Sequence, residues 1–447
     1  MDEITESEGF DRTHLGLPAQ HIALVEAIAK VHQSVVLVLS NGGAIELPSA
    51  CTIISAILEG YLLGQSSGGA IVDLIFGIQS PCGKLAETMP EKNVDILAHH
   101  YFPGTRDVVE YREGLDVGYR YFDTVQKPVR FPFGHGLSYT SFEYSNLNVK
   151  VTKDDTREKE VIVSFTVQNI GRMAGQEVAQ CYVKDIEASV YRPAHELKDY
   201  CKVLLQPGQK KIIEFRLGQD AFAFYDIGAK DWAVEPGFFE VQIGASSRDL
   251  RLKESLEFKQ GQAVSNLSKE SYPPRMDSLL SEIDDATFAS RFGNRRDEVL
   301  RGIDARKNKQ NEQHFHRNTL LKDVAKHRLV GYILFLVTFF FASKDLQPGD
   351  DERRQKKLIK ENVDHLPLRA VALFGKGAIS LEALDALIDI MNYHWLSAIM
   401  RLIFAPLNSL HLLTRRLWPT QTSYDQTPMN AGMQSTATRQ ASKTKTS

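Results

Sequence analysis

The stretch LPAQHIALVEAIAKVHQSVVLVLSNGG, residues 17–43, joins two different patterns of apolar residues. In its first half, Ile22, Val25 and Ile28 recur every three residues, which is the spacing of an amphipathic helix. The second half, from Val35, is an unbroken apolar run that ends at Asn-Gly-Gly, as a buried parallel strand does. A helix followed by a buried strand predicts a parallel sheet that is covered by helices.

The same alternation continues further along the chain. TIISAILEGYL (52–62) is a second apolar run, and GQSSGGAIVDLIFG (64–77) places glycines before a short helix. We therefore expect an α/β layer domain over residues 14 to about 95. Because ligands of such sheets bind at the carboxyl ends of the strands, the loops SNGG and EGYLLGQSSGG should face any site.

A different pattern begins at Val161. Short segments of alternating apolar and polar residues are separated by turn-forming residues, and they read VIVSFTVQNIG, QEVAQCYVKD, KKIIEFRLG and GFFEVQIGAS. This spacing predicts an antiparallel β-sandwich of the immunoglobulin type at residues 142–258. The Cys-Trp-Cys spacing of true immunoglobulin domains is missing from the sequence.

Residues 259–418 are predicted to form a helical extension, and the tail at 419–447, rich in Ser, Thr and Gln, to be disordered. The extension holds two apolar segments, RLVGYILFLVTFFFAS (328–343) and a longer one from Ala383. The first is shorter than the roughly 20 residues that cross a bilayer comfortably. We expect helices that pack on the sandwich or on each other. The alternative is weak attachment to a membrane surface, because basic residues flank both segments.

The amino-acid composition limits the classes of function that this protein can have. The 447 residues are 24% charged and 43% hydrophobic, which is typical of a soluble protein of two or three domains. A formal net charge of -3 provides no general attraction to nucleic acid. The four cysteines form no CxxC pair and no zinc-ligand spacing, so we expect buried thiols of a reducing compartment, with no metal and no cofactor. The acidic N-terminus lacks the features of a secretory signal, which predicts a cytoplasmic chain.

The most chemically suggestive segment is TESEGFDR, residues 5–12, in which three carboxylates and an arginine surround one glycine. These residues alone leave two interpretations open. The segment is either a solvated acidic N-terminus or a capping box, in which the Thr5 side chain meets the backbone N–H of Glu8.

Further motifs, in a fixed order, add a third interpretation. They are ESEGFDR, VVLVLSNGGAIELP, GQSSGGAIVDLIFG, SPCGKLAETMP, VEYREGLDVGYRYFD and FPFGHGLSYTSFEYS. In this order they resemble the C-terminal part of the family 3 glycoside hydrolases, the β-glucosidases and their relatives, over residues 5 to about 258. The helical region at 316–392 also resembles, more loosely, a C-terminal extension of one subset of that family.

The resemblance implies a multidomain α/β plus all-β fold. An α/β sandwich domain with a parallel sheet (1–141) would precede a fibronectin type III-like β-sandwich (142–258) and the helical extension. The resemblance also implies retaining hydrolysis of terminal β-D-glucosyl residues by two carboxylates, with a β-glucoside or oligosaccharide as substrate. In this family the nucleophile is an aspartate of a (β/α)8 barrel that precedes the sandwich domain. The general acid and base is the glutamate of an EGxDR motif, which is Glu8 in this sequence.

On this interpretation, the chain begins where the barrel of the family ends. Retention needs two carboxyl groups about 5 to 5.5 Å apart and an acid with a raised pKa. Without a barrel beside it, Glu8 would be exposed, with a pKa near the ordinary value of about 4.3. We therefore expect an incomplete catalytic site in the isolated chain, unless a separate chain supplies the barrel. The alternatives are a truncated gene model and a non-catalytic module that binds a carbohydrate or a partner, associated with a membrane through its C-terminal helices.

Four more residues are candidate substrate-binding residues. Asp11 and Arg12 would orient the loop of Glu8, or else form an ordinary surface ion pair. Tyr111 and Glu113 belong to a segment that would line the rim of a sugar pocket. Packing in a core is the alternative for this segment, because three more aromatic residues follow within about ten positions.

Overall fold

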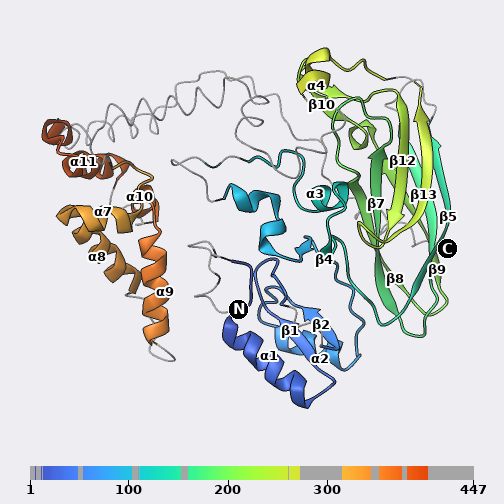
Figure 1. Cartoon of the computed structure of the whole chain (residues 1–447), viewed down its shortest axis with the longest axis horizontal. Coiled ribbons are helices and arrows are strands. Elements are labelled where there is room, and N and C mark those ends of the chain that lie inside the picture. Colours follow the sequence, from blue (N-terminus) through green and yellow to red (C-terminus); the bar gives the residue numbers. More distant parts are fainter. Residues whose placement is uncertain are drawn as a thin grey trace, which may run out of the picture. The chain divides into compact units, whose positions relative to one another are not determined.

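The computed structural model describes residues 6, 12, 14–48, 54–102, 109, 111–152, 160–259, 261–271, 315–343, 352–374 and 380–400. They belong to two compact units, within residues 1–311 and 312–447 (Figure 1). The first unit contains an α/β layer and a β-sandwich, and the second is helical. The predicted disordered tail at 419–447 lies outside the described residues.

The α/β layer is built on a parallel pair of strands, β1 (Val36–Leu39) and β2 (Ala56–Glu59), as the apolar runs predict. Helix α1 (Ala19–Val31) precedes β1 in the chain, and α2 (Ser67–Ile75) follows β2. The small core of the layer contains Leu17, Leu39, Ile45 and Leu47.

The prediction of a fully buried strand is wrong for β1. Val36 is 49% exposed, and only Leu39 of the strand is buried. Helix α2 likewise has no buried residue. The physical reason is that the sheet has two strands within the described residues, so each strand has one edge and part of one face without a neighbour.

The layer continues with shorter elements. These are β3 (Met89–Pro90), which pairs with β4 (Val129–Phe131), the 3-10 turns η2 (Asn93–Asp95) and η3 (Leu97–His100), and the helix α3 (Tyr119–Thr124). The side chains of Leu97, Tyr121 and Phe122 are buried together with Tyr191, which comes from the next domain.

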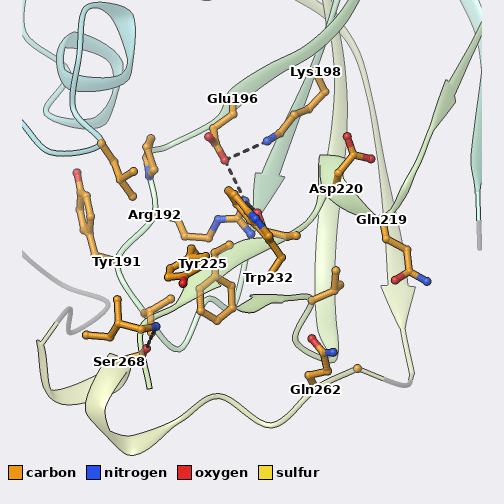
Figure 2. A pocket seen from close by; sticks show the side chains of 18 of the residues that line it. Tyr191, Arg192, Glu196, Lys198, Gln219, Asp220, Tyr225, Trp232, Gln262 and Ser268 are labelled. Atoms are coloured by element: carbon orange, nitrogen blue, oxygen red, sulfur yellow. Dashed lines mark hydrogen bonds and ion pairs between the residues drawn. The ribbon is translucent and has the colours of Figure 1, made fainter. Parts of the chain in front are cut away.

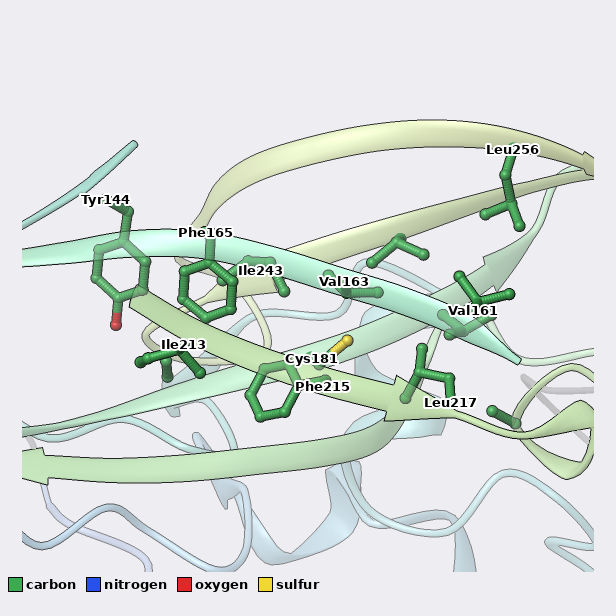
Figure 3. Close-up of a cluster of buried hydrophobic side chains, with 14 of the residues drawn as sticks. Tyr144, Val161, Val163, Phe165, Cys181, Ile213, Phe215, Leu217, Ile243 and Leu256 are labelled. Carbon is green, nitrogen blue, oxygen red and sulfur yellow. The ribbon is translucent and has the colours of Figure 1, made fainter. Parts of the chain in front are cut away.

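An antiparallel β-sandwich occupies residues 142–258 and packs two sheets around one core (Figures 1 and 3). One sheet has the order β5-β6-β9 and the other β13-β12-β7-β8. Their strands are β5 (Phe142–Val151), β6 (Val161–Asn169), β7 (Gly175–Asp185), β8 (Glu196–Leu205), β9 (Lys210–Leu217), β12 (Gly237–Gly244) and β13 (Leu250–Phe258).

Strand β6 shows why this sequence forms a sandwich. Its odd-numbered residues, Val161, Val163, Phe165 and Val167, are buried, and the residues between them are less so. Because side chains of a strand alternate between faces, this pattern turns one whole face of β6 toward the core. Figure 3 shows Phe165 in the cluster that also holds Phe215 and Ile243 from other strands.

Two additions to the sandwich shape its surface. A hairpin of β10 (Phe224–Asp226) and β11 (Asp231–Ala233) follows the turn η4 (Gln219–Ala221), and the short helix α4 (Asn266–Ser271) follows β13.

Motifs GYRYFD and FPFGHG join the layer to the sandwich. Asp123 of α3 accepts a hydrogen bond of 2.6 Å from Arg248 and lies 3.3 Å from Nε2 of His195. The hydroxyl of Tyr119 accepts a bond of 2.7 Å from the backbone N–H of Leu197. These buried polar contacts fix α3 against the β-sandwich.

The second unit contains α7 (Leu321–His327), α8 (Leu329–Ser343), α9 (Glu352–Asp364), α10 (Leu368–Phe374) and α11 (Leu381–Met391). These helices pack on each other around a core that includes Leu321, Leu334, Leu368 and Leu384. Throughout the described ranges, none of the helices combines the length and the apolarity that crossing a bilayer requires.

Candidate functional site

Polar side chains gather at the carboxyl ends of β1 and β2. We call this group the carboxylate cluster, and its members are Glu6, Arg12, Asn41, Glu59, Tyr61 and Glu87. The loops SNGG and EGYLL both contribute to it, which confirms that parallel-strand order brings them to one edge of the sheet.

Glu6 and Arg12 attach the N-terminal motif to the SNGG loop. Glu6 Oε2 accepts a hydrogen bond of 2.6 Å from the backbone N–H of Gly42. Arg12 donates from Nη2 to the carbonyl of Ala44 at 3.1 Å, and its Nη1 lies 3.5 Å from Glu6 Oε1. A Cβ on residue 42 would come within 3.0 Å of the Glu6 carboxylate, so the glycine is what allows this approach.

Asn41 and Tyr61 hold Glu59 from two sides. Asn41 is 1% exposed, and its Nδ2 donates to the Gly43 carbonyl at 2.8 Å and to Glu59 Oε2 at 3.4 Å. Glu59 Oε1 accepts from the backbone N–H of Tyr61 at 2.8 Å. Tyr61 has a φ of +48°, a left-handed conformation that is strained for a residue with a Cβ and typical of functional loops.

Burial raises the pKa of two glutamates of the cluster, Glu59 at the end of β2 and Glu87. The pKa of Glu59 is raised first by burial and also by the nearby charges of Glu87 and Glu6. Burial likewise raises the pKa of Glu87, and the side chain of Tyr61, the backbone of Ala44 and the charge of Arg12 partly oppose it. Repulsion from neighbouring carboxylates thus adds to burial, and Glu59 and Glu87 hold their protons to higher pH than exposed glutamates do.

Two buried donor atoms of the cluster face carboxylates. Nη1 of Arg12 lies 3.5 Å from Glu6, and the hydroxyl of Tyr61 bonds to Glu87. Oδ1 of Asn41 is buried and has no hydrogen-bond partner within the described residues. Because buried polar groups in folded proteins are almost always hydrogen-bonded, this oxygen marks a place where a polar group can donate to the cluster.

The predicted site residues do not all meet here. Glu8 and Asp11 lie outside the described residues, so the roles proposed for them stay predictions. Arg12 belongs to the cluster, where its charge faces Glu6. Tyr111 is 83% exposed and Glu113 is half-buried, and neither is bonded to Arg12 in the described part of the chain.

Packing in a core explains the aromatic residues that follow Tyr111 in the sequence, but it does not explain Tyr111 itself. Tyr119, Tyr121 and Phe122 are all buried, whereas Tyr111 projects toward solvent at the mouth of a separate pocket.

Sequence reasoning missed most of the cluster. Glu6, Asn41, Glu59 and Tyr61 all lie in motifs or strand-end loops that were singled out, so their position was a usable signal. Glu87 lies in the motif SPCGKLAETMP, but it is far along the chain from both strand-end loops, so its place in the cluster could not be predicted from its position.

Known proteins resemble this chain in both of its first two domains. Residues 1–139 match the Glycosyl hydrolase family 3 C-terminal domain, and residues 177–247 match the Fibronectin type III-like domain. Thermostable beta-glucosidase B of Acetivibrio thermocellus is 51% identical over 252 residues, which is 56% of this chain and 33% of that protein. An exo-alpha-(1->6)-L-arabinopyranosidase of Bifidobacterium longum is 43% identical over 250 residues, 56% of this chain and 32% of that protein.

Solved structures agree. The GH3 beta-glucosidase of Bifidobacterium adolescentis superposes with a TM-score of 0.57 at 38% identity, covering 63% of this chain and 42% of that one. The beta-glucosidase of Kluyveromyces marxianus in complex with glucose gives a TM-score of 0.55 at 35% identity, over 57% and 30% of the two chains.

The chain spans about a third of the length of the curated relatives it matches, and the match covers the C-terminal part of those proteins. Its strand order, its motifs and both domain matches lead to the same assignment. The chain therefore carries the C-terminal domain of glycoside hydrolase family 3, followed by a fibronectin type III-like domain.

Proposed function

We propose that this chain supplies the acid–base half of a retaining β-glucosidase site, with Glu8 as general acid and base. One observation carries the proposal. Glu6 and Arg12, which flank Glu8 in the sequence, are both bound to the loop that follows β1. That loop lies at the carboxyl end of a parallel strand, where ligands of α/β sheets bind.

The chemistry needs a second carboxylate from a barrel domain, in the same protein or in a separate chain. In the first step, Glu8 gives its proton to the glycosidic oxygen while the barrel carboxylate attacks the anomeric carbon and the bond to the leaving group breaks. In the second step, water replaces the enzyme carboxylate, and Glu8 takes the proton of that water.

The carboxylate cluster supports this role through its charges. Glu59 and Glu87 both have raised pKa values, and a further carboxyl placed near them would also hold its proton to higher pH. Arg12 then acts as a positioning residue through its ties to Glu6 and Ala44.

We propose terminal β-D-glucosides or β-linked oligosaccharides as substrates, because the names of most relatives are those of β-glucosidases. We also propose a reducing compartment such as the cytoplasm. Three cysteines, Cys82, Cys181 and Cys201, are free thiols, and free thiols are typical of proteins in such compartments.

Hydrolysis of a chromogenic aryl β-D-glucoside tests the catalytic role. The purified chain is assayed alone and after mixing with the separately expressed barrel of the Acetivibrio thermocellus relative. We expect activity only in the mixture, and a loss of roughly 100-fold or more with Glu8→Gln. Glu143→Gln, on the exposed side of β5, is the matched control and should leave the rate unchanged.

Two results would contradict the proposal. Equal activity of the Glu8→Gln and unchanged chains in the mixture would exclude Glu8 as the acid. Activity of the chain alone that is lost in Glu8→Gln would mean that the nucleophile comes from this chain and not from a barrel.

A second function, attachment to a membrane surface, is favoured by one observation on α8. Its exposed apolar residues recur every three or four positions and form one stripe, made of Leu329, Tyr332, Ile333, Leu336, Val337, Phe340 and Phe341. The opposite side of the helix packs on α7, where Gly331 lies directly against Val324. Anionic membranes bind exposed apolar surface that lies beside basic side chains, and Lys326 is exposed just before this stripe.

Sedimentation with anionic phospholipid vesicles tests this second function. We expect the chain to pellet with the vesicles and Phe340→Asp to remain in the supernatant. Leu267→Asp, at a 53% exposed leucine of the first unit, is the control and should still pellet. Absence of the unchanged chain from the pellet would remove this candidate.

A further inference from the structure

A pocket of about 1210 Å³ opens on the first unit, between the loop at residues 111–115 and the hairpin β10–β11 (Figure 2). None of the residues that line it belongs to the carboxylate cluster. Its volume exceeds that of a site for one small molecule, which is about 300 to 1,000 Å³, so it has room for an extended ligand.

Two aromatic rings form the centre of this pocket. Tyr225 and Trp232 are directly opposite each other in the β10–β11 pair, with ring centroids 5.7 Å apart. They are 49% and 63% exposed, and Tyr111 stands at the same pocket. Exposed aromatic residues that gather at one concave place mark a binding site more often than chance exposure does.

The hairpin presents these rings on a rigid support. Asp226, on its other face, is fully buried and accepts hydrogen bonds from the backbone of Gly228 at 2.9 Å and from the hydroxyl of Ser268 at 2.8 Å. The hydroxyl and the backbone N–H of Ser265 also donate to the Asp226 carboxylate. These two bonds are the main reason why the pKa of Asp226 lies far below its usual range. Asp226 thus ties the hairpin to α4, and the two rings need little reordering to bind a ligand.

The charged wall of the pocket is neutralised by its own pairs. Glu196 accepts from Arg192 at 2.9 Å and lies 3.4 Å from the ammonium of Lys198, and dashed lines mark both contacts in Figure 2. Arg192 also donates to the carbonyl of Phe222 at 2.7 Å. A wall of mutually paired charges attracts an anion weakly, which favours an uncharged ligand.

Exposed polar side chains form the rim. Gln219 and Asp220 come from the turn η4, and Gln262 from the segment after β13. An amide group both donates to and accepts from hydroxyl groups, and a carboxylate accepts from them. These groups line the same pocket as the two aromatic rings.

We propose that this pocket is a non-catalytic binding site for an uncharged oligosaccharide. The apolar C–H face of one pyranose ring would lie against Trp232 or Tyr225, while Gln219, Asp220 and Gln262 bond to its hydroxyl groups. The choice of a glucose-based oligosaccharide rests on the proposed function, whereas the preference for a neutral polyhydroxylated ring follows from the pocket itself.

Isothermal titration with β-1,4-linked and β-1,3-linked glucotetraose tests the site. The Glu8→Gln chain is used, so that hydrolysis cannot consume the ligand. We expect binding of at least one tetrasaccharide, and Kd values raised about tenfold by Trp232→Ala and by Tyr225→Ala. Tyr200→Ala, at a 65% exposed tyrosine of β8, is the matched control and should bind as before.

A second variant distinguishes a loss of binding from a loss of folding. Asp220→Asn changes one exposed rim group without removing packing, and it should weaken binding several-fold while circular dichroism stays unchanged. A deca-proline peptide is also titrated, because aromatic grooves bind such peptides as well. Binding of that peptide alone, absence of oligosaccharide binding, or equal affinity in the Trp232→Ala chain would each overturn the proposal.

The two proposals fail separately. Hydrolysis by the mixture with the barrel, without tetrasaccharide binding by the Glu8→Gln chain, would overturn the pocket alone. Binding that depends on Trp232, without hydrolysis in any mixture, would overturn the catalytic role alone.

Discussion

Asp116 should destabilise the folded protein at neutral pH. This carboxyl is 3% exposed and accepts a hydrogen bond of 2.6 Å from the hydroxyl of Tyr191. Burial, opposed in part by Tyr191 and Arg120, raises its pKa from 3.8 to about 6. Replacement by asparagine keeps an oxygen that can accept the Tyr191 bond and removes the charge that burial penalises. Asp116→Asn should therefore stabilise the protein.

The sign and size follow from proton linkage. Between pH 3.8 and about 6, the folded state holds the Asp116 proton and the unfolded state loses it, so stability falls as the pH rises. At about 1.4 kcal/mol per pH unit, the loss is complete above about pH 6 and amounts to about 3 kcal/mol. Asp116→Asn should recover up to that amount at about pH 7.5 and progressively less toward pH 4.5.

Urea unfolding at several pH values measures this effect. Trp395→Phe and Trp418→Phe leave Trp232 as the single tryptophan, so that its fluorescence follows the sandwich. Asp123→Asn is the control with the opposite sign. Burial raises the pKa of Asp123, but hydrogen bonds from His195 and Arg248 outweigh it and leave the pKa lowered, so removal of this charge should destabilise at about pH 7.5. An Asp116→Asn gain that does not change with pH, or a loss at about pH 7.5, would refute the reasoning.

Three further predictions concern packing, and each is checked by urea unfolding or by thermal melting followed by circular dichroism. Phe165→Ala removes a 1% exposed ring from the sandwich core and should cost about 3 to 5 kcal/mol of unfolding free energy. Asn169→Ala should cost about 1 to 3 kcal/mol or more, because this buried amide donates at 2.8 Å to the carbonyl of Met173 and at 2.9 Å to that of Leu205. Gly136→Ala should also cost about 1 to 3 kcal/mol, because a Cβ there would clash with the carbonyl of Gly83, whereas Gly69→Ala, with open space around it, should not destabilise.

Periodicity predicted those parts of the fold in which one face of an element meets a core. Strand β6 is the clearest example, since its alternation of apolar and polar residues is the same as its alternation of burial. The unbroken run that contains β1 predicted parallel pairing, which the structure confirms, but it could not show how much of the strand is covered. Coverage depends on neighbouring elements, and the pattern within one strand does not contain that information.

The carboxylate cluster was predictable in its place and not in its members. The alternation of helices and strands predicts that the strand-end loops face a site, and the EGxDR motif makes Arg12 a candidate residue of that site. The contact between Asn41 and Glu59 depends on the register that pairs Leu39 with Glu59, and no local pattern specifies that register. Glu87 joins the cluster from beyond α2, so only tertiary structure shows its role.

The amino-acid sequence indicates the pocket of the sandwich even less clearly than it indicates the carboxylate cluster. Tyr225 and Trp232 face the same side only because the intervening turn sets their register as opposite partners. Tyr111 lines this pocket, and its predicted place at the rim of a sugar pocket stays a prediction.

The incomplete cover of the β1–β2 sheet has a consequence for hydrogen exchange. A pair of strands with a 49% exposed valine, beside a helix without a buried residue, can open locally while the rest of the protein stays folded. Amide protons of β1 and β2 should therefore exchange with deuterium much sooner than those of β6 or β12, which lie in the interior of their sheets. The carboxylate cluster therefore lies at the ends of strands that should exchange sooner than the interior strands of the sandwich.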